Sequence, residues 1–198
     1  MREQVIAIHG GDAYATYEEY LSSLLGKVVN LEWLHFRDWK NSLEESLGSG
    51  FEVVLPRMPN AQNAKYAEWK IWFEKLIPHI QDGVILVGHS LGGSFLAKYL
   101  SENIFPKKVK ATFLVAAPFD MDSGRELVEF NIVSSLDLLR EQGGKIFLYH
   151  SKDDPVVAFT ELAKYQQQLQ EATTRVFEDR KHFNQDQFPE LVQDIKSL

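Results

Sequence analysis

The sequence of 198 residues contains no cysteine. It therefore has no disulfide framework, no thiolate metal site and no cysteine nucleophile. The absence of disulfides suits a reducing compartment. The apolar stretch after Met1–Gln4 is also too short for the core of a signal peptide, so we expect a cytoplasmic protein.

Long apolar runs and an excess of positive charge are missing as well. No run of about 18 apolar residues occurs, so the sequence predicts no membrane-spanning helix. The 28 acidic and 21 basic residues give a net charge of −7. Nucleic acids and anionic membrane surfaces are bound by basic faces, so we expect neither as a partner.

What the sequence does contain is an alternation of short apolar runs with longer amphipathic ones. Several of the short runs are apolar on both faces, as buried parallel strands are. The predicted strands are Val5–His9, Phe51–Leu55, Val84–Gly88, Ala111–Ala116, Lys145–His150 and Thr174–Phe177. The predicted helices are Thr16–Leu25, which opens with a capping-box spacing, Asp38–Leu47, Lys65–Ile77, Leu91–Ser101, Thr160–Glu171 and Phe188–Leu198.

This alternation predicts one domain over residues 1–198, an α/β fold in which helices cover both faces of a mostly parallel six-stranded sheet. The architecture is a three-layer α/β/α sandwich. Ligands of such sheets bind at the carboxyl ends of the strands. We therefore expect the functional side chains to lie just after strands.

The segment Gly88–Gly92 has the pattern G-x-S-x-G around Ser90. It follows the strand pattern Val84–Val87 and precedes a helical pattern. In a tight strand-to-helix turn of this kind a serine hydroxyl projects above the sheet, and the glycines keep side chains out of the turn. Ser90 is therefore the predicted nucleophile, and the backbone N–H of Leu91 a predicted donor to an oxyanion. The alternative is a strand–turn–helix joint that only uses small residues.

A glycine-rich loop, His9–Asp12, follows the first predicted strand. A tetrahedral intermediate needs two preorganised donors, and glycines allow the backbone to approach a substrate closely. We expect Gly11 N–H to be the second donor, with His9 helping to shape the loop. A phosphate-binding loop is disfavoured because neither G-x-G-x-x-G nor G-x-x-x-x-G-K-[ST] occurs. A plain turn before a helix is the other alternative.

Six histidines compete for the role of general base: His9, His35, His79, His89, His150 and His182. The base must reach Ser90 from a loop at the carboxyl edge of the sheet. His182 follows the last predicted strand, and the order Ser, Asp, His along the chain is that of α/β-hydrolases. His89 adjoins the serine, so its side chain should leave the turn in another direction. A surface histidine is the alternative interpretation of His182.

The acid should come from the loop after Lys145–His150, where Asp153 and Asp154 are adjacent. A carboxylate there can accept the imidazole Nδ1–H, fix the tautomer and stabilise the imidazolium. Loop neighbours can each turn inward, so both remain candidates. Pro155 restricts the chain directly after Asp154 and favours it as the rigidly placed acid.

With these features in order, the chain resembles the α/β-hydrolase superfamily, and within it the small serine hydrolases related to retinoblastoma-binding protein nine and its bacterial relatives. The resemblance rests on compact length, His9–Asp12, Gly88–Ser90, the acid loop Asp153–Pro155 and His182-Phe183 before a short final helix. It implies a sheet order of 2-1-3-4-5-6 and hydrolysis of small acyl esters without a cofactor. The chain itself has no large inserted lid, so we expect a shallow or open site. The acid directly precedes the proline in those relatives, which supports Asp154.

Two segments have no clear place in this pattern. Leu31–Gly50 is longer than in those relatives and carries Trp33, Phe36 and Trp39. Phe119–Asn131 is either a short cap over the site or an ordinary connection. The tryptophans at 33, 39, 69 and 72 are candidates for an acyl pocket or, alternatively, core and interface residues.

These observations predict a serine hydrolase that cleaves a small-molecule acyl ester through an acyl-enzyme, with Ser90, His182 and Asp154 as the catalytic residues. We expect no metal, since no H-E-x-x-H or comparable ligand cluster occurs. A thioesterase, a lyase on the same fold, and a binding protein with a vestigial triad are the alternatives.

Overall fold

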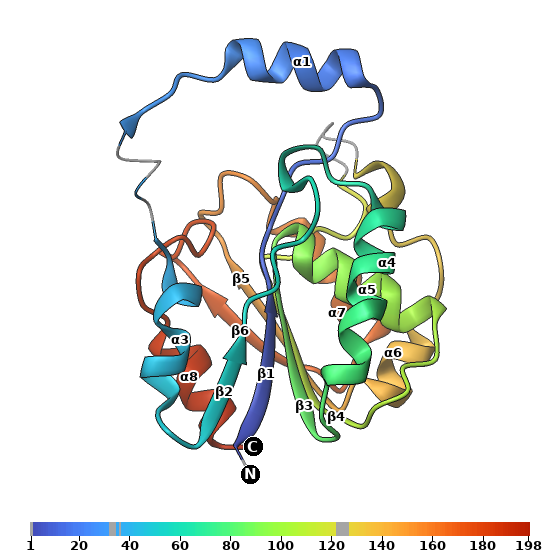
Figure 1. Ribbon diagram of the computed structural model, residues 1–198, viewed down its shortest axis with the longest axis vertical. Helices are drawn as coiled ribbons and strands as arrows, with labels where there is room; N and C mark the ends of the chain where they lie inside the picture. Colours follow the sequence, from blue (N-terminus) through green and yellow to red (C-terminus); the bar gives the residue numbers. More distant parts are fainter. Residues whose placement is uncertain (1, 32–34, 36, 122–126) are drawn as a thin grey trace.

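The computed structural model describes residues 2–31, 35, 37–121 and 127–198. Its centre is a six-stranded sheet in the order β2-β1-β3-β4-β5-β6, and each neighbouring pair is parallel (Figure 1). The strands are β1 (Glu3–Ile8), β2 (Phe51–Val54), β3 (Val84–His89), β4 (Val109–Val115), β5 (Lys145–Ser151) and β6 (Thr173–Phe177). The predicted fold class and strand order are confirmed.

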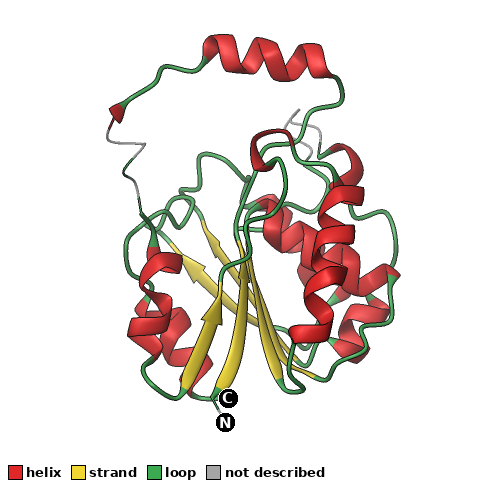
Figure 2. Ribbon diagram, in the orientation of Figure 1, coloured by secondary structure: helices red, strands yellow, loops and turns green. Residues whose placement is uncertain are grey.

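Helices cover both faces of this sheet (Figure 2). They are α1 (Tyr17–Gly26), α3 (Trp39–Leu47), α4 (Tyr66–Leu76), α5 (Leu91–Glu102), α6 (Asp137–Gln142), α7 (Thr160–Gln168) and α8 (Pro189–Lys196). Short 3-10 helices lie at Ala61–Asn63, Ile77–His79 and Val128–Phe130. Helices α3 and α8 pack on one face of the sheet, and α4 to α7 pack on the other.

The alternation of side chains along each strand builds two separate cores. Along β1, Val5 and Ala7 belong to the core under α3 and α8, whereas Ile6 and Ile8 belong to the core on the opposite face. This is the two-residue period of an extended strand. Strand β3, which is apolar on both faces, is buried throughout, as expected for a central parallel strand.

The register brings the carboxyl ends of the strands to one edge. Ile8 at the end of β1 pairs with Gly88, and His89 at the end of β3 pairs with Val115. The loops that follow these strands therefore start side by side. This is the edge at which the sequence predicts the functional side chains.

Helix α6 was not predicted, and α7 ends earlier than predicted. Helix α6 is only six residues long, so its sequence is too short to show a helical period. Helix α7 stops at Gln168, and the turn at Leu169–Ala172 returns the chain to β6. Both differences lie at the amino-terminal edge of the strands, away from the candidate site.

Helix α1 differs from the others because it lies beyond the carboxyl edge of the sheet, apart from both layers (Figure 1). None of its residues is buried. Thr16 and Glu19 form the predicted capping box at its start. Within the described part of the chain, no helix has the length and apolar character to cross a membrane.

Candidate active site

Ser90 occupies the sharp turn between β3 and α5. Its backbone has φ 55° and ψ −126°, a conformation that costs a non-glycine residue about 1–3 kcal/mol. A hydrogen bond of 2.8 Å from Ser90 N to Val115 O holds the turn against β4. A Cβ atom on Gly92 would lie 2.5 Å from the carbonyl oxygens of Ile8 and His9. Packing against β1 therefore requires a glycine at position 92.

The Ser90 hydroxyl points to an imidazole from a distant loop. His182 Nε2 lies 2.9 Å from Ser90 Oγ, and its Nδ1 lies 2.9 Å and 3.1 Å from the two carboxylate oxygens of Asp154. The three residues follow β3, β6 and β5. An ionised carboxylate can only accept, so it places the imidazole proton on Nδ1 and leaves Nε2 free to accept from the hydroxyl.

Of the two adjacent aspartates, Asp154 is the one at His182. Its side chain has no exposed area, and Oδ1 also accepts backbone N–H groups from Val156 at 2.8 Å and Val157 at 3.0 Å. Asp153 instead accepts from Ser151 Oγ at 2.5 Å and Lys181 N at 2.9 Å. Asp153 thus joins the acid loop to the loop that carries His182.

Gly11 and Leu91 lie close together beside Ser90. A Cβ atom on Gly11 would lie 3.3 Å from Leu91 Cδ2 and 2.6 Å from Ala61 O, so the loop leaves no room for a side chain. Leu91 is the first residue of α5, and its N–H therefore has no acceptor within the helix. Among the described residues, no hydrogen bond uses the N–H of Gly11 or that of Leu91.

His9 shapes this loop, as expected. Its Nδ1 lies 2.6 Å from Gly10 O and its Nε2 accepts from Met58 N at 2.9 Å. Because Met58 N can only donate, the proton must be on Nδ1, which then donates to the Gly10 carbonyl. Asp12 adds two backbone hydrogen bonds to Ala61 and Ala64. The glycine loop is therefore held on both sides.

His89, the residue before Ser90, lines the same cleft, and its ring nitrogens contact Lys40 and the His182 carbonyl instead of the Ser90 hydroxyl. It is buried, and burial together with the nearby Lys40 ammonium lowers its pKa well below the ordinary value. Its Nε2 lies 2.8 Å from His182 O, and its Nδ1 lies 3.1 Å from Lys40 Nζ. Lys40 also forms an ion pair with Asp38.

The remaining histidines lie away from Ser90. His150 donates from Nε2 to Val157 O at 3.0 Å under the acid loop, and burial lowers its pKa. His79 ends the short helix Ile77–His79, where its carbonyl accepts from Gln4. His35 is exposed.

A cleft of about 1050 Å³ opens above Ser90 and His182. One wall, after β4 and β5, is mostly apolar. Another part of the wall carries polar and charged groups from the loop before α1, from α1 itself and from the start of α3. The apolar wall contains Pro118, Met121, Leu127, Val156 and Val157, and the polar wall contains Asp12, Tyr14, Glu19, Ser22, Ser23, Lys27, Asp38 and Lys40.

The two segments that have no clear place in the sequence pattern, Phe119–Asn131 and Leu31–Gly50, contribute to the site in different ways. Residues 122–126 of Phe119–Asn131 lie outside the described residues. Phe119 and Phe130 are buried in the core, while Met121 and Leu127 line the cleft. Leu31–Gly50 carries α3, and its residues Trp33 and Phe36 lie outside the described part.

The described tryptophans are mainly core residues. Trp39 and Trp69 are buried in the two cores, and Trp72 is 42% exposed on α4. None of the three lines the cleft. Trp39 has a second role that the sequence did not indicate, since its Nε1 donates to Phe183 O at 2.9 Å.

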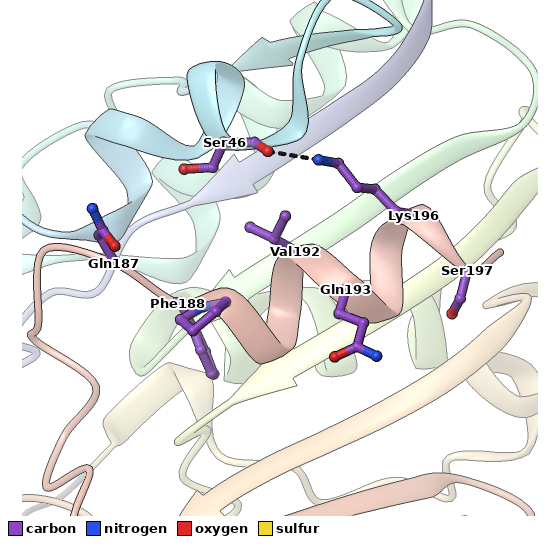
Figure 3. Close-up of a pocket in the computed structure, with 8 residues that line it drawn as sticks. Ser46, Gln187, Phe188, Val192, Gln193, Lys196 and Ser197 are labelled. Carbon is purple, nitrogen blue, oxygen red and sulfur yellow. Dashed lines mark hydrogen bonds between the residues drawn. The ribbon is translucent and has the colours of Figure 1, made fainter.

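A smaller cavity of about 460 Å³ lies between α3 and α8 (Figure 3). Lys196 Nζ reaches across it to Ser46 O at 2.8 Å, and Val192 and Phe188 form part of its wall. None of the predicted site residues lines this cavity. Gly11, Ser90, Leu91 and His182 line the larger cleft instead.

Lys40 and Asp38 are the residues at the site that sequence reasoning missed. They precede the elbow by about fifty positions, and nothing in their local pattern distinguishes them from the solvated end of a helix. In the structure Lys40 is 9% exposed, which is rare for a lysine. The described residues contain no group of three or more His, Asp or Glu side chains placed to hold a metal ion.

Comparison with known proteins supports the same class of chemistry. The family model for serine hydrolases matches residues 35–193. Serine hydrolase RBBP9 of Rattus norvegicus is 27% identical over 153 residues, which cover 75% of this chain and 78% of the rat protein.

Two solved structures show the same fold. The ydeN gene product from B. subtilis has a TM-score of 0.73 and 20% identity, covering 98% of this chain and 97% of its own. Est1E from Butyrivibrio proteoclasticus has a TM-score of 0.62 and 15% identity, covering 99% of this chain and 86% of its own. These similarities confirm the α/β-hydrolase fold that the sequence predicted.

Proposed function

The chain belongs to the serine hydrolase family, and on this premise we propose that it cleaves small carboxylic esters with Ser90 as nucleophile, His182 as general base and Asp154 as orienting acid. The observation that carries the proposal is the continuous chain of hydrogen-bond distances from Ser90 Oγ through His182 to Asp154. All three residues follow strands of one sheet. This common edge also supports one hydrolase domain over residues 1–198.

In the first step Ser90 Oγ attacks the ester carbonyl carbon while its proton passes to His182 Nε2. The carbon–oxygen π pair moves onto the carbonyl oxygen. When the tetrahedral intermediate collapses, the bond to the alcohol oxygen breaks, and His182 gives its proton to that oxygen. Asp154, held by two backbone N–H groups, stabilises the imidazolium between these transfers.

In the second step a water replaces the alcohol. His182 removes a proton from the water as its oxygen attacks the acyl carbon, and the proton then goes to Ser90 Oγ as the acid leaves. The N–H groups of Gly11 and Leu91 are the proposed donors to the oxyanion in both steps. They satisfy the requirement that such donors be preorganised and not already used.

The two walls of the cleft support an ester as the substrate class. The wall at Pro118, Met121 and Val157 can accept an apolar group, and the wall at Lys27 and Asp38 can accept a polar one. An ester of a short apolar acyl group with a more polar alcohol has this division. Because only a few apolar side chains line the cleft, we propose short acyl chains as the preferred class.

The first test is covalent labelling by a fluorophosphonate probe followed by peptide mapping. We expect one labelled peptide, with the modification on Ser90, and no labelling of Ser90→Ala. Ser101→Ala is a matched control, because Ser101 lies at the other end of the same helix and bonds only to Ala97 O. Labelling that persists in Ser90→Ala would exclude Ser90 as the nucleophile.

The second test is hydrolysis of p-nitrophenyl esters with acyl chains of increasing length. We expect Ser90→Ala to lower kcat by about 10⁴-fold or more, because the nucleophile is lost while the fold remains. A parallel thioester series distinguishes the thioesterase alternative. A chain that is labelled at Ser90 but turns over neither series would contradict esterase activity.

A further inference from the structure

His89, one residue before the nucleophile, makes two hydrogen bonds that define its protonation. Nε2 lies 2.8 Å from His182 O, and Nδ1 lies 3.1 Å from Lys40 Nζ. A protonated lysine can only donate and a carbonyl can only accept. The Nδ1 atom must therefore be the acceptor, and Nε2 must carry the proton that it donates to His182 O.

The His182 carbonyl is one of four backbone carbonyls in this loop that accept hydrogen bonds from α3 or from His89. Trp39 Nε1 donates to Phe183 O at 2.9 Å and Trp39 N donates to Gln185 O at 2.9 Å. Ser42 Oγ adds a bond of 2.9 Å to Asp186 O. The start of α3 and the ring of His89 together hold the loop that carries the catalytic base.

This loop needs to be held because its backbone is strained. Lys181 and Phe183, on either side of His182, have φ values of 48° and 53°. Left-handed backbone is unfavourable for a residue that has a Cβ atom. The conformation that points the imidazole at Ser90 therefore persists only where surrounding contacts determine it.

We propose that Lys40 is a positioning residue for the catalytic base: by donating to His89 Nδ1 it fixes the His89 tautomer that holds the His182 carbonyl. The proposal rests on the assignment of His182 as the base. The site then has two imidazoles, and each has its tautomer set by a different charged partner. Asp154, an acceptor, sets the tautomer of His182, and Lys40, a donor, sets the tautomer of His89.

The surroundings of Lys40 suit this role. Trp39 lies below the ammonium, which is 4.7 Å from the centre of the indole ring, and Asp38 is its ion-pair partner. Burial lowers the pKa of Lys40, and Asp38 opposes that shift. Burial and the Lys40 charge keep the pKa of His89 well below its ordinary value, so its ring stays neutral while His182 exchanges protons.

Removing the ammonium takes away the donor that keeps His89 Nδ1 unprotonated. In Lys40→Met that donor is lost, while the Asp38 carboxylate remains without its cation. The ring can then gain a second proton at Nδ1 or exchange to the Nδ1 tautomer, in which Nε2 has no proton to donate to His182 O. Lys40→Arg is the matched control, because a guanidinium also only donates and keeps the positive charge beside Asp38.

The direct test is NMR of the imidazole nitrogens in ¹⁵N-labelled protein, with the His89 signals assigned by their loss in His89→Gln. In the wild type and Lys40→Arg we expect a neutral ring protonated on Nε2. In Lys40→Met we expect the Nδ1-protonated or doubly protonated form. A ring that stays fully Nε2-protonated in Lys40→Met would overturn the proposal.

Kinetics provides the second readout. We expect Lys40→Met to lower kcat on a short ester about tenfold and to change KM by a smaller factor, because the base is misplaced while the apolar part of the cleft is kept. Lys40→Arg should retain kcat within about twofold. Equal activity of Lys40→Met and wild type, or equal loss in both variants, would overturn the positioning role.

Two outcomes, a Lys40→Met variant that does not fold and a wild type that is not labelled at Ser90, each have a separate comparison. If Lys40→Met does not fold, Asp38→Asn/Lys40→Met replaces it, since the double variant leaves no unpaired carboxylate. If Ser90 is not labelled in the wild type, the esterase proposal fails, but the NMR comparison still decides whether Lys40 sets the His89 tautomer. The two proposals can therefore fail separately.

Discussion

Helices α1 and α3 lie in the same connection between β1 and β2, and both border the cleft, yet they are held in opposite ways. In α3 the side chains of Trp39, Leu43 and Leu47 are buried against the sheet. In α1 no residue is buried, and Leu25 is 89% exposed. Both helices begin with a capping box, so capping does not explain the difference.

The difference lies in what each helix packs on. Helix α3 contacts α8 and one face of the sheet, and its apolar side chains complete that core. Helix α1 is attached through its polar side, with Lys27 paired to Asp12 at 3.0 Å and Ser23 bonded to Tyr14 at 2.7 Å. An exposed ion pair of this kind contributes about 0–1 kcal/mol. One connection therefore contains a helix that is buried in a core and a helix that has no buried residue, and both border the cleft above Ser90.

The largest expected effect is on the α3 core. Leu43→Ala should lower the free energy of unfolding by about 3 kcal/mol, because a fully buried side chain leaves a cavity. Leu25→Ala in α1 should change it by less than about 0.5 kcal/mol. Urea denaturation measures both. Similar losses of unfolding free energy in the two variants would contradict the difference between α3 and α1.

The next effect concerns the hydrogen bond from Trp39 to the loop that contains His182. Trp39→Phe removes the donor to Phe183 O and should cost about 2 kcal/mol of stability, because a buried carbonyl loses its partner. It should also lower kcat, since Phe183 adjoins His182. Trp72→Phe, at an exposed position on α4, is the control. Thermal unfolding and ester kinetics are measured on the same samples. A Trp39→Phe variant that matches wild type in both measurements would contradict this expectation.

A smaller effect should appear in the pH dependence of the free energy of unfolding, through Asp194 in α8. Burial alone would raise the pKa of Asp194, but hydrogen bonds from Arg175 and Tyr149 more than offset it and lower the pKa. A lowered carboxyl pKa stabilises the fold above the unfolded value of about 4, and this stability is lost as the pH falls through the folded value.

Asp194→Asn should therefore cost about 1–2 kcal/mol at pH 7 and make stability less sensitive to acid below about pH 4. Asp12→Asn, which breaks the exposed pair of α1, should do neither, and its small effect should vanish at high salt. The measurement is urea unfolding between pH 3 and pH 7, a range set by the reference carboxyl pKa of about 4. An unchanged acid dependence in Asp194→Asn would contradict this account.

The smallest effect is confined to α1. Thr16→Ala removes the cap and should destabilise that helix locally by about 1 kcal/mol. Because α1 has no buried residues, global unfolding should be unchanged while hydrogen exchange of the α1 amides becomes faster. A clear fall in the global unfolding midpoint would show that α1 is coupled to the core.

Much of the fold followed from local patterns. Strand β3 and the helix after it were readable because a buried apolar run ends in Gly88–Gly92. Helix α6 was not readable because six residues carry no period. The segment around Trp39 was recognised as unusual, but its contacts with Phe183 join positions 144 residues apart, and no local pattern contains them.

Local sequence was enough to predict the strand alternation, the turn at Ser90 and the glycine loop at Gly11, because each depends on the backbone preferences of a few neighbouring residues. Only in the folded chain can it be seen that Asp154 faces His182 and that Lys40 contacts His89, whose ring in turn contacts His182. The physical reason is that these contacts depend on side-chain direction and on the packing of α3 against the sheet, and both are set by residues far apart in the chain.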